Sequence, residues 1–136
     1  MPTQPIFTLL AIRHGETASN AAKRYQGHSD SPLTETGRKQ VSSLGSRMAK
    51  MEFDVLICSD LGRTRETASI IAKHTGHSVK TDSRLRERNY GVLEGLTVPE
   101  INTRYSEVLD RLDTGTLRSM KASGLLTETG RRAWTR

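Results

Sequence analysis

The sequence predicts an α/β domain with a mostly parallel sheet. Short apolar runs of strand length alternate along the chain with longer segments whose apolar residues recur at helical spacing. This alternation is typical of units in which a helix connects one parallel strand to the next. The chain has 136 residues, the size of one domain, and its hydrophobic fraction of 34% predicts a small core.

Residues 6–12 form the first apolar run, Ile-Phe-Thr-Leu-Leu-Ala-Ile. A near-continuous apolar run of this length is typical of a parallel strand covered on both faces, so we expect it to be a central strand. Gly15 then permits a sharp exit, and the small polar residues 16–20 predict a ligand-facing loop. Residues 21–33 lack periodicity and predict a loop over the site.

A helix is predicted from residue 34 onward because apolar side chains recur along one stripe, and Thr34 or Thr36 can supply its N-cap oxygen. The stripe consists of Val41, Leu44, Met48 and Met51. Residues 53–58 follow as a second apolar strand. This strand ends on Ser59 and Asp60, which can cap the next helix.

Residues 62–75 predict that next helix, with Gly76 as its C-terminal stop. Its buried face is expected to hold Ala68, Ile71, Ala72 and Thr75. A short third strand is predicted near residues 79–81.

The strongest helix-start signal is the capping box from Thr97 to Glu100, which has Pro99 in the first turn. Helical spacing then continues through Ile101, Tyr105, Val108, Leu109 and Leu112. No clear period follows Asp113. The sequence therefore divides into a domain of residues 1–113 and a basic C-terminal tail of residues 114–136 with no predicted structure.

The net charge of +6 does not indicate a nucleic-acid partner, because residues 114–136 carry five basic side chains against one acidic side chain and so hold most of the excess. Aromatic residues at 4% also leave few stacking platforms for single strands. No window approaches the about 18 consecutive apolar residues of a membrane span, and the N-terminus lacks the features of a secretory signal. We expect a soluble cytoplasmic protein that binds neither nucleic acid nor membrane.

Cys58 is the single cysteine, so it cannot form an intrachain disulfide, and its place in an apolar run predicts a buried strand residue. No cluster of histidine, cysteine, aspartate or glutamate has the ligand spacing of a zinc or magnesium site. The sequence therefore implies no metal and no cofactor.

The predicted strand ends gather residues suited to phosphate chemistry. Ligands of parallel sheets bind beyond the carboxyl ends of the strands. We therefore expect one binding site at that edge of the sheet, formed by Arg13, His14, residues 59–63 and Glu87. An imidazole can attack phosphorus and hold the group as phosphohistidine. Guanidinium groups can grip the phosphate oxygens, and a carboxylic acid can protonate the departing alkoxide.

Four blocks of residues carry a family resemblance. They are Arg13-His14-Gly15-Glu16-Thr17 with Asn20, then residues 26–34, residues 59–68 and residues 86–95. In this order and spacing they resemble the histidine phosphatase superfamily in its cofactor-dependent phosphoglycerate mutase-like branch. The resemblance spans about residues 6–112 and implies a three-layer α/β/α fold.

The resemblance also implies site roles. His14 matches the histidine that becomes phosphorylated, and Arg13 and Arg63 match the arginines of the phosphate pocket. Glu87 matches the proton donor. The residues that match phosphoryl-contacting or substrate-contacting positions are Asn20, Gln26, Gly27 and Tyr90.

Two departures from the family pattern narrow this expectation. Val98 stands where the true mutases have a lysine, and residues 91–95 look more like those of the phosphatases, so a phosphatase is favoured over a mutase. Family members also continue to a Ser-His-Gly block with a second pocket histidine, whereas this sequence has no histidine after His77. The sequence therefore looks truncated relative to the family.

The strand that bears that second histidine lies, in the family fold, between the equivalents of residues 6–12 and 53–58. Its absence would leave unpaired backbone groups beside apolar side chains. Three ways of filling the gap are open: the two strands close up directly, the tail inserts, or a second chain pairs the edge and gives a homo-oligomer.

Three functions follow as hypotheses. The first is phosphoryl transfer or phosphomonoester hydrolysis on a small phosphorylated substrate through phospho-His14. The alternative is a catalytically impaired remnant that binds a phosphate ligand. A nucleic-acid binder is the third, and it rests on the basic tail alone.

Overall fold

The structure of the chain is a computed structural model that describes residues 7–106. The chain divides into two compact units. The first unit lies within residues 1–17 and 32–86, and the second unit lies within residues 18–31 and 87–136. The predicted boundary at residue 113 and the tail of residues 114–136 fall outside the described residues.

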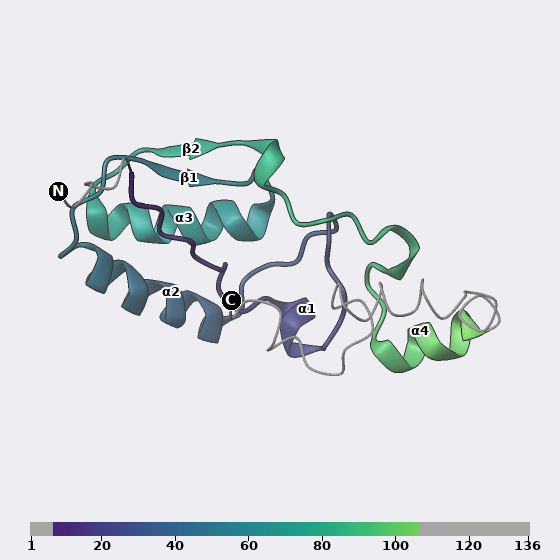
Figure 1. The fold of residues 1–136 in the computed structure, drawn as a ribbon. Helices are drawn as coiled ribbons and strands as arrows, with labels where there is room; N and C mark the ends of the chain where they lie inside the picture. Colours follow the sequence, from purple (N-terminus) through teal and green to yellow (C-terminus); the bar gives the residue numbers. More distant parts are fainter. Residues whose placement is uncertain (1–6, 107–136) are drawn as a thin grey trace, which may run out of the picture. The chain divides into compact units, whose positions relative to one another are not determined.

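Helices and strands alternate along the described residues (Figure 1). In chain order the elements are helix α1 (Ala18–Ala21), helix α2 (Glu35–Met48), strand β1 (Leu56–Cys58), helix α3 (Gly62–Thr75), strand β2 (Val79–Thr81), the short 3-10 turns η1 (Ser83–Leu85) and η2 (Gly91–Leu93), and helix α4 (Val98–Arg104).

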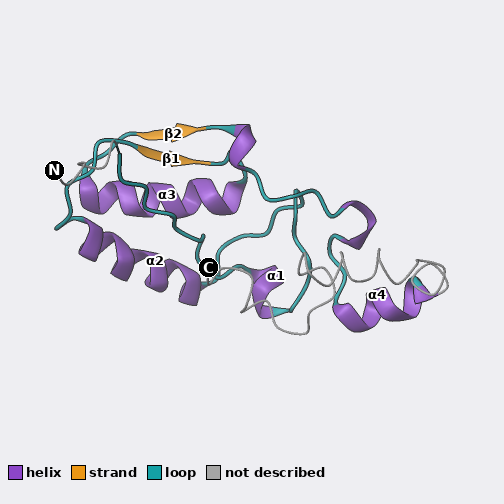
Figure 2. Cartoon of the chain, viewed as in Figure 1, coloured by secondary structure: helices purple, strands orange, loops and turns teal. Residues whose placement is uncertain are grey.

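The first unit contains a small parallel sheet. Strand β1 pairs with β2 in parallel, with Leu56 opposite Val79 and Cys58 opposite Thr81. Helix α3 connects the two strands and packs against both, and α2 packs along α3 (Figures 1 and 2). The predicted α/β class with a parallel sheet is confirmed at this level.

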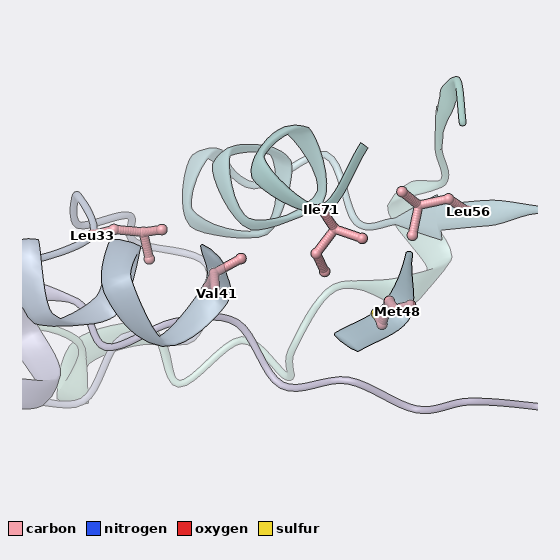
Figure 3. Packing of buried hydrophobic residues seen from close by; sticks show 5 residues of the cluster. All are labelled: Leu33, Val41, Met48, Leu56 and Ile71. Carbon is pink, nitrogen blue, oxygen red and sulfur yellow. The ribbon is translucent and has the colours of Figure 1, made fainter. Parts of the chain in front are cut away.

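Side chains from α2, β1 and α3 form the core of the first unit, together with Leu33, which lies two residues before α2 (Figure 3). Its members are Leu33, Val41, Met48, Leu56 and Ile71. Ile71 is only 1% exposed, so the predicted apolar faces of both helices are confirmed. Met51 was expected on the same stripe, but it is 45% exposed because α2 ends at Met48.

The capping residues of α2 and α3 agree with the predicted ones, with one exception. Thr34, not Thr36, caps α2, since the Thr34 hydroxyl accepts a hydrogen bond from the Gly37 N–H at 3.0 Å. Gly76 ends α3 in the left-handed conformation with φ 76°. The prediction that Ser59 or Asp60 caps α3 is wrong, because Leu61 occupies the N-cap without a side-chain bond.

Both predicted cap residues are engaged elsewhere. The Ser59 hydroxyl lies 2.7 Å from the Thr64 hydroxyl, and the Asp60 carboxylate accepts a hydrogen bond from Arg86 Nε at 2.6 Å. Cys58 lies in the predicted strand but is only partly buried, and burial raises the pKa of its thiol.

Residues 7–12 do not form the central strand that the sequence predicts. They form neither a strand nor part of the core, and Figure 2 draws them as loop. Phe7 is 77% exposed and Leu9 is 78% exposed. A strand needs a neighbour for its backbone hydrogen bonds, and the sheet among the described residues contains β1 and β2 alone.

This arrangement also excludes one of the three predicted ways of filling the gap in the sheet. Residues 7–12 do not pair with β1, so direct closure of the first two predicted strands is wrong for the described residues. Insertion of the tail and pairing with a second chain stay predictions.

The second unit is held by backbone contacts between its two segments. Arg24 and Thr97 form an isolated antiparallel bridge, the Tyr25 N–H donates to the Leu96 carbonyl at 3.0 Å, and the Gly95 N–H donates to the Tyr25 carbonyl at 2.8 Å. The capping box of Thr97 and Glu100 is confirmed.

Two predictions for the second unit need correction. Residues 18–21 form the single turn α1 rather than loop, with the Ala22 N–H donating to the Ala18 carbonyl at 3.0 Å. Helix α4 ends at Arg104, so Tyr105 is its C-cap. Its predicted continuation through residues 108–112 lies outside the described residues.

Candidate active site

His14 lies at the end of the exposed N-terminal segment and is partly buried. Its Nδ1 lies 2.8 Å from the Gly15 carbonyl oxygen. Because a carbonyl oxygen can only accept, Nδ1 must carry the proton and donate. The neutral ring then carries its lone pair on Nε2, the atom that a nucleophilic imidazole uses.

The loop after His14 is anchored to both long helices of the first unit. The Gly15 N–H donates to the Thr67 hydroxyl on α3 at 3.2 Å. The Glu16 N–H donates to Gln40 Oε1 on α2 at 3.2 Å, and the Glu16 carbonyl accepts from the Thr34 N–H at 2.9 Å. These bonds fix the backbone that carries His14.

Gly15 is required by close packing rather than by a sharp turn of the chain after the predicted strand. A Cβ at this position would lie 2.7 Å from the Gly37 carbonyl oxygen and 2.7 Å from Val41 Cγ2. A Cβ on Gly37 would lie 2.1 Å from the Glu16 carbonyl oxygen. The two glycines therefore allow the His14 loop to lie directly on the first turn of α2.

Arg63 lies in the first turn of α3 and is 3% exposed. The Thr67 hydroxyl donates to the Arg63 carbonyl at 2.8 Å and accepts from the Gly15 N–H. Thr67 thus joins the His14 loop to the helix turn that bears Arg63. Arg13 precedes His14 in the sequence and is exposed, so all three residues predicted for the phosphate pocket belong to the first unit.

The second unit brings together another group of predicted site residues. Gln26 is 8% exposed, and Gly27 adopts a φ of 59°. A Cβ on Gly27 would lie 2.8 Å from Tyr90 Cδ2, so the glycine lies directly against the Tyr90 ring. The Tyr90 ring also meets the Tyr25 ring edge to face at 5.2 Å.

Asn20 and Glu87 complete the predicted set, and both belong to the second unit. Asn20 lies in α1, where its carbonyl accepts from the Lys23 N–H at 3.0 Å. Glu87 is exposed, and its carboxylate accepts from the Arg88 N–H at 2.8 Å. Burial raises the pKa of Tyr90, and the Glu87 charge adds to that rise.

The residues of the predicted common binding site are therefore distributed over two units. Arg13, His14 and Arg63 lie in the first unit, and Glu87 lies in the second unit with the predicted substrate contacts. Their assembly into one site stays a prediction.

Sequence reasoning missed three residues that position the others. Gln40 and Thr67 hold the His14 loop, and Glu94 holds the turn at residues 26–29. Thr67 lies one helical turn after Arg63, a spacing that could have indicated it. The bonds of Gln40 to the His14 loop and of Glu94 to residues 28 and 29 carried no local signal, because they join residues at least 24 positions apart in the sequence.

The described residues contain no group of three or more histidine, cysteine, aspartate or glutamate side chains placed to hold a metal ion. Of the helices within residues 7–106, none has the length and apolar character needed to cross a membrane.

The first unit is a parallel α/β unit that holds the His14 loop against α2 and α3 and buries Arg63 in the first turn of α3. The family model of the histidine phosphatase superfamily (branch 1) matches residues 9–136. The chain belongs to this superfamily, in its phosphoglycerate mutase-like part.

Curated relatives agree with this membership. The chain is 43% identical over 122 residues to the "Probable phosphoglycerate mutase GpmB" of Yersinia pestis, an alignment that covers 89% of this chain and 57% of the relative. The protein of the same name from Yersinia pseudotuberculosis matches equally. The chain therefore spans little more than half the length of these relatives.

Solved structures show the same fold. YhfR of Bacillus stearothermophilus matches with a TM-score of 0.70 and 36% identity, over 88% of this chain and 55% of that chain. A mycobacterial glucosyl-3-phosphoglycerate phosphatase in complex with VO3 matches with a TM-score of 0.65 and 34% identity, over 71% of this chain and 49% of that chain.

Proposed function

We propose that this chain performs phosphoryl transfer or phosphomonoester hydrolysis through a phosphohistidine at His14. The observation that carries the proposal is the hydrogen bond from His14 Nδ1 to the Gly15 carbonyl, at 2.8 Å, because it leaves the lone pair on Nε2. Family membership supports the same chemistry.

Each remaining residue has a role in the proposed reaction. His14 Nε2 forms the bond to phosphorus while the bond to the leaving oxygen breaks, and Glu87 gives that oxygen a proton. Water then attacks phosphorus and returns a proton to the Glu87 carboxylate, and the step releases inorganic phosphate and the free imidazole. Arg13 and Arg63 neutralise the charge of the transferring group.

The substrate of the proposed reaction is a small phosphorylated molecule. Asn20, Gln26, Gly27 and Tyr90 are the proposed contacts to its phosphoryl group and its body. A phosphatase is favoured over a mutase, because Val98 occupies the position of the mutase lysine. The matched proteins include a solved phosphatase and relatives named probable phosphoglycerate mutases, so the preference rests on Val98. A complete three-layer α/β/α arrangement belongs to this proposal as well.

The test compares p-nitrophenyl phosphate turnover by the unaltered chain and by His14→Ala. We expect turnover by the unaltered chain and a loss of about a hundredfold or more in the variant, because the nucleophile is removed. His74→Gln is the matched control, since His74 contacts Ser42 on α2 and belongs to no proposed site. Equal turnover in all three proteins would refute the proposal.

A second candidate function is binding of a phosphate ligand without efficient turnover. It is favoured because Arg13, His14 and Arg63, which suit phosphate binding, lie in the first unit, whereas the proposed proton donor Glu87 lies in the second unit. Calorimetry with orthovanadate distinguishes the two functions. Binding without His14-dependent turnover would select this candidate, and turnover would select the first.

A further inference from the structure

The Glu94 carboxylate is a point of convergence in the second unit. Its Oε1 accepts hydrogen bonds from the His28 N–H at 2.8 Å and the Tyr90 N–H at 3.0 Å, and its Oε2 accepts from the Ser29 N–H at 2.7 Å. The Ser29 bond joins residues 65 positions apart in the sequence. One side chain therefore ties the turn at residues 26–29 to the turn at residues 90–94.

The packing around this carboxylate is close. Gly27 has a φ of 59°, and a Cβ on it would lie 2.2 Å from Glu94 Oε1 and 2.9 Å from the Tyr90 nitrogen. The Ser29 hydroxyl closes the same turn by donating to the Gln26 carbonyl at 2.6 Å. The carboxylate is thus wedged between the two proposed substrate-contacting segments.

Glu94 is held in its charged form. Burial alone would raise its pKa, but the N–H groups of His28, Ser29 and Tyr90 outweigh burial and lower the pKa below its ordinary value. An acceptor with a full negative charge makes stronger hydrogen bonds to backbone N–H groups than a neutral acceptor does.

We propose that Glu94 is a positioning residue that holds the Gln26–Gly27 turn against Tyr90 and so sets substrate affinity. This inference rests on the proposed function, to which it adds a residue with no direct contact to the reacting atoms. Without the carboxylate, three N–H groups lose their shared acceptor. The two segments can then separate, and the substrate must reorder them on binding.

Glu100 provides a matched control in the same unit. Its carboxylate also accepts a backbone N–H, that of Thr97 at 2.7 Å, and it pairs with Arg24 at 2.7 Å. These contacts hold the start of α4 and the Arg24 side chain, and they touch none of the proposed site residues. Glu100→Gln therefore removes a comparable carboxylate without disturbing the turn at residues 26–29.

The test measures KM and kcat for p-nitrophenyl phosphate with the full chain and with Glu94→Ala, Glu94→Gln and Glu100→Gln. We expect Glu94→Ala to raise KM about tenfold and to leave kcat within about twofold, because one charge-assisted anchor of the binding surface is lost. Glu94→Gln should rescue part of the affinity, since its carbonyl oxygen can still accept the His28 and Tyr90 N–H groups. Glu100→Gln should leave KM unchanged.

Amide hydrogen exchange supplies a second readout that does not need turnover. The amides of His28, Ser29 and Tyr90 should exchange faster in both Glu94 variants than in the Glu100 variant. If Glu94→Ala does not fold, Glu94→Gln alone decides the question by its KM and its exchange rates.

The failure of this inference and the failure of the proposed function are distinguishable. His14-dependent turnover with an unchanged KM in the Glu94 variants overturns the role of Glu94 and leaves the proposed function standing. If the unaltered chain shows no turnover, the proposed reaction fails, and the dissociation constant of p-nitrophenyl phosphate then replaces KM in the same comparison. If the unaltered chain neither turns over nor binds p-nitrophenyl phosphate, both are overturned.

Discussion

Thr67 connects two predicted site residues through one hydroxyl group. This buried hydroxyl accepts from the Gly15 N–H and donates to the Arg63 carbonyl, across 52 residues of sequence on the Gly15 side. Threonine hydroxyls within helices can donate to the carbonyl four residues earlier. Here the Thr67 oxygen also accepts the Gly15 N–H and so orients the backbone of the His14 loop.

Thr67→Val removes this hydroxyl at nearly constant volume. The buried Gly15 N–H would then lack its acceptor, which costs about 1–3 kcal/mol in the free energy of unfolding. Turnover should fall as well, because the His14 loop loses its attachment to α3. Urea unfolding and p-nitrophenyl phosphate turnover measure the two effects.

Thr67→Ser is the control, since serine keeps the hydroxyl and loses only a methyl group. It should retain most of the stability and activity that valine removes. If Thr67→Val keeps the stability and activity and Thr67→Ser loses them, the methyl group and not the hydrogen bond is what matters at this position.

At the scale of elements, local signals were sufficient where an element is stabilised by its own residues. Gly76 stops α3, Thr34 caps α2, and the capping box of Thr97 and Glu100 starts α4, as the sequence predicts. Strand β2 also lies at the predicted residues 79–81. Each of these features depends on groups within a few positions of one another.

Residues 7–12 failed as a predicted strand for the opposite reason. Their composition favours a buried strand, yet a strand is stable only with a hydrogen-bonded neighbour, and a neighbour is not a local property of sequence. The contacts of Thr67 and Glu94 were missed on the same ground. Residue types indicated which side chains could handle phosphate, and long-range contacts decide how those side chains are held.

The capping box of α4 yields a prediction about acid. The Thr97 N–H first, and then Arg24 and the Thr97 hydroxyl, lower the pKa of Glu100 from 4.5 to about 2. A lowered native pKa means that the carboxylate stabilises the fold fully above pH 4.5 and loses this contribution as the pH falls through about 2. The carboxyl carbon of Glu100 should therefore titrate with a midpoint of about 2 by NMR.

Arg24→Ala tests the cause of that shift. Arg24 donates to Glu100 at 2.7 Å and to the Gly95 carbonyl at 2.6 Å, so its removal leaves the Thr97 bonds as the main stabilisers of the charge. The Glu100 midpoint should rise toward the ordinary value of a glutamate. A midpoint that does not move would show that the capping box alone holds the carboxylate.

At the scale of the whole chain, the candidate site is divided between two units. The proposed nucleophile and the proposed phosphate-binding arginines belong to the first unit, whereas the proposed proton donor and substrate contacts belong to the second unit. In each unit one side chain holds the backbone near the predicted site residues by hydrogen bonds, Thr67 in the first unit and Glu94 in the second. The local order of each half therefore depends on contacts within its own unit, and the proposed reaction requires residues of both units at one substrate.

The exposed apolar side chains of the first unit give the last prediction. Phe7 and Leu9 are 77% and 78% exposed, and Val55 and Ile57, beside and within β1, are 49% and 50% exposed. Side chains of this kind at this exposure bind amphiphilic dyes such as ANS. The native chain at neutral pH should therefore enhance ANS fluorescence.

Leu9→Ser combined with Ile57→Ser should lower that fluorescence and change the free energy of unfolding by no more than about 0.5 kcal/mol, because neither side chain is in the core. Leu56→Ser is the contrasting variant. Leu56 is 8% exposed within the core cluster, so this change should cost about 2–5 kcal/mol and raise ANS binding by loosening the fold. A native chain that does not bind ANS would contradict the prediction, because these side chains would then be covered in solution.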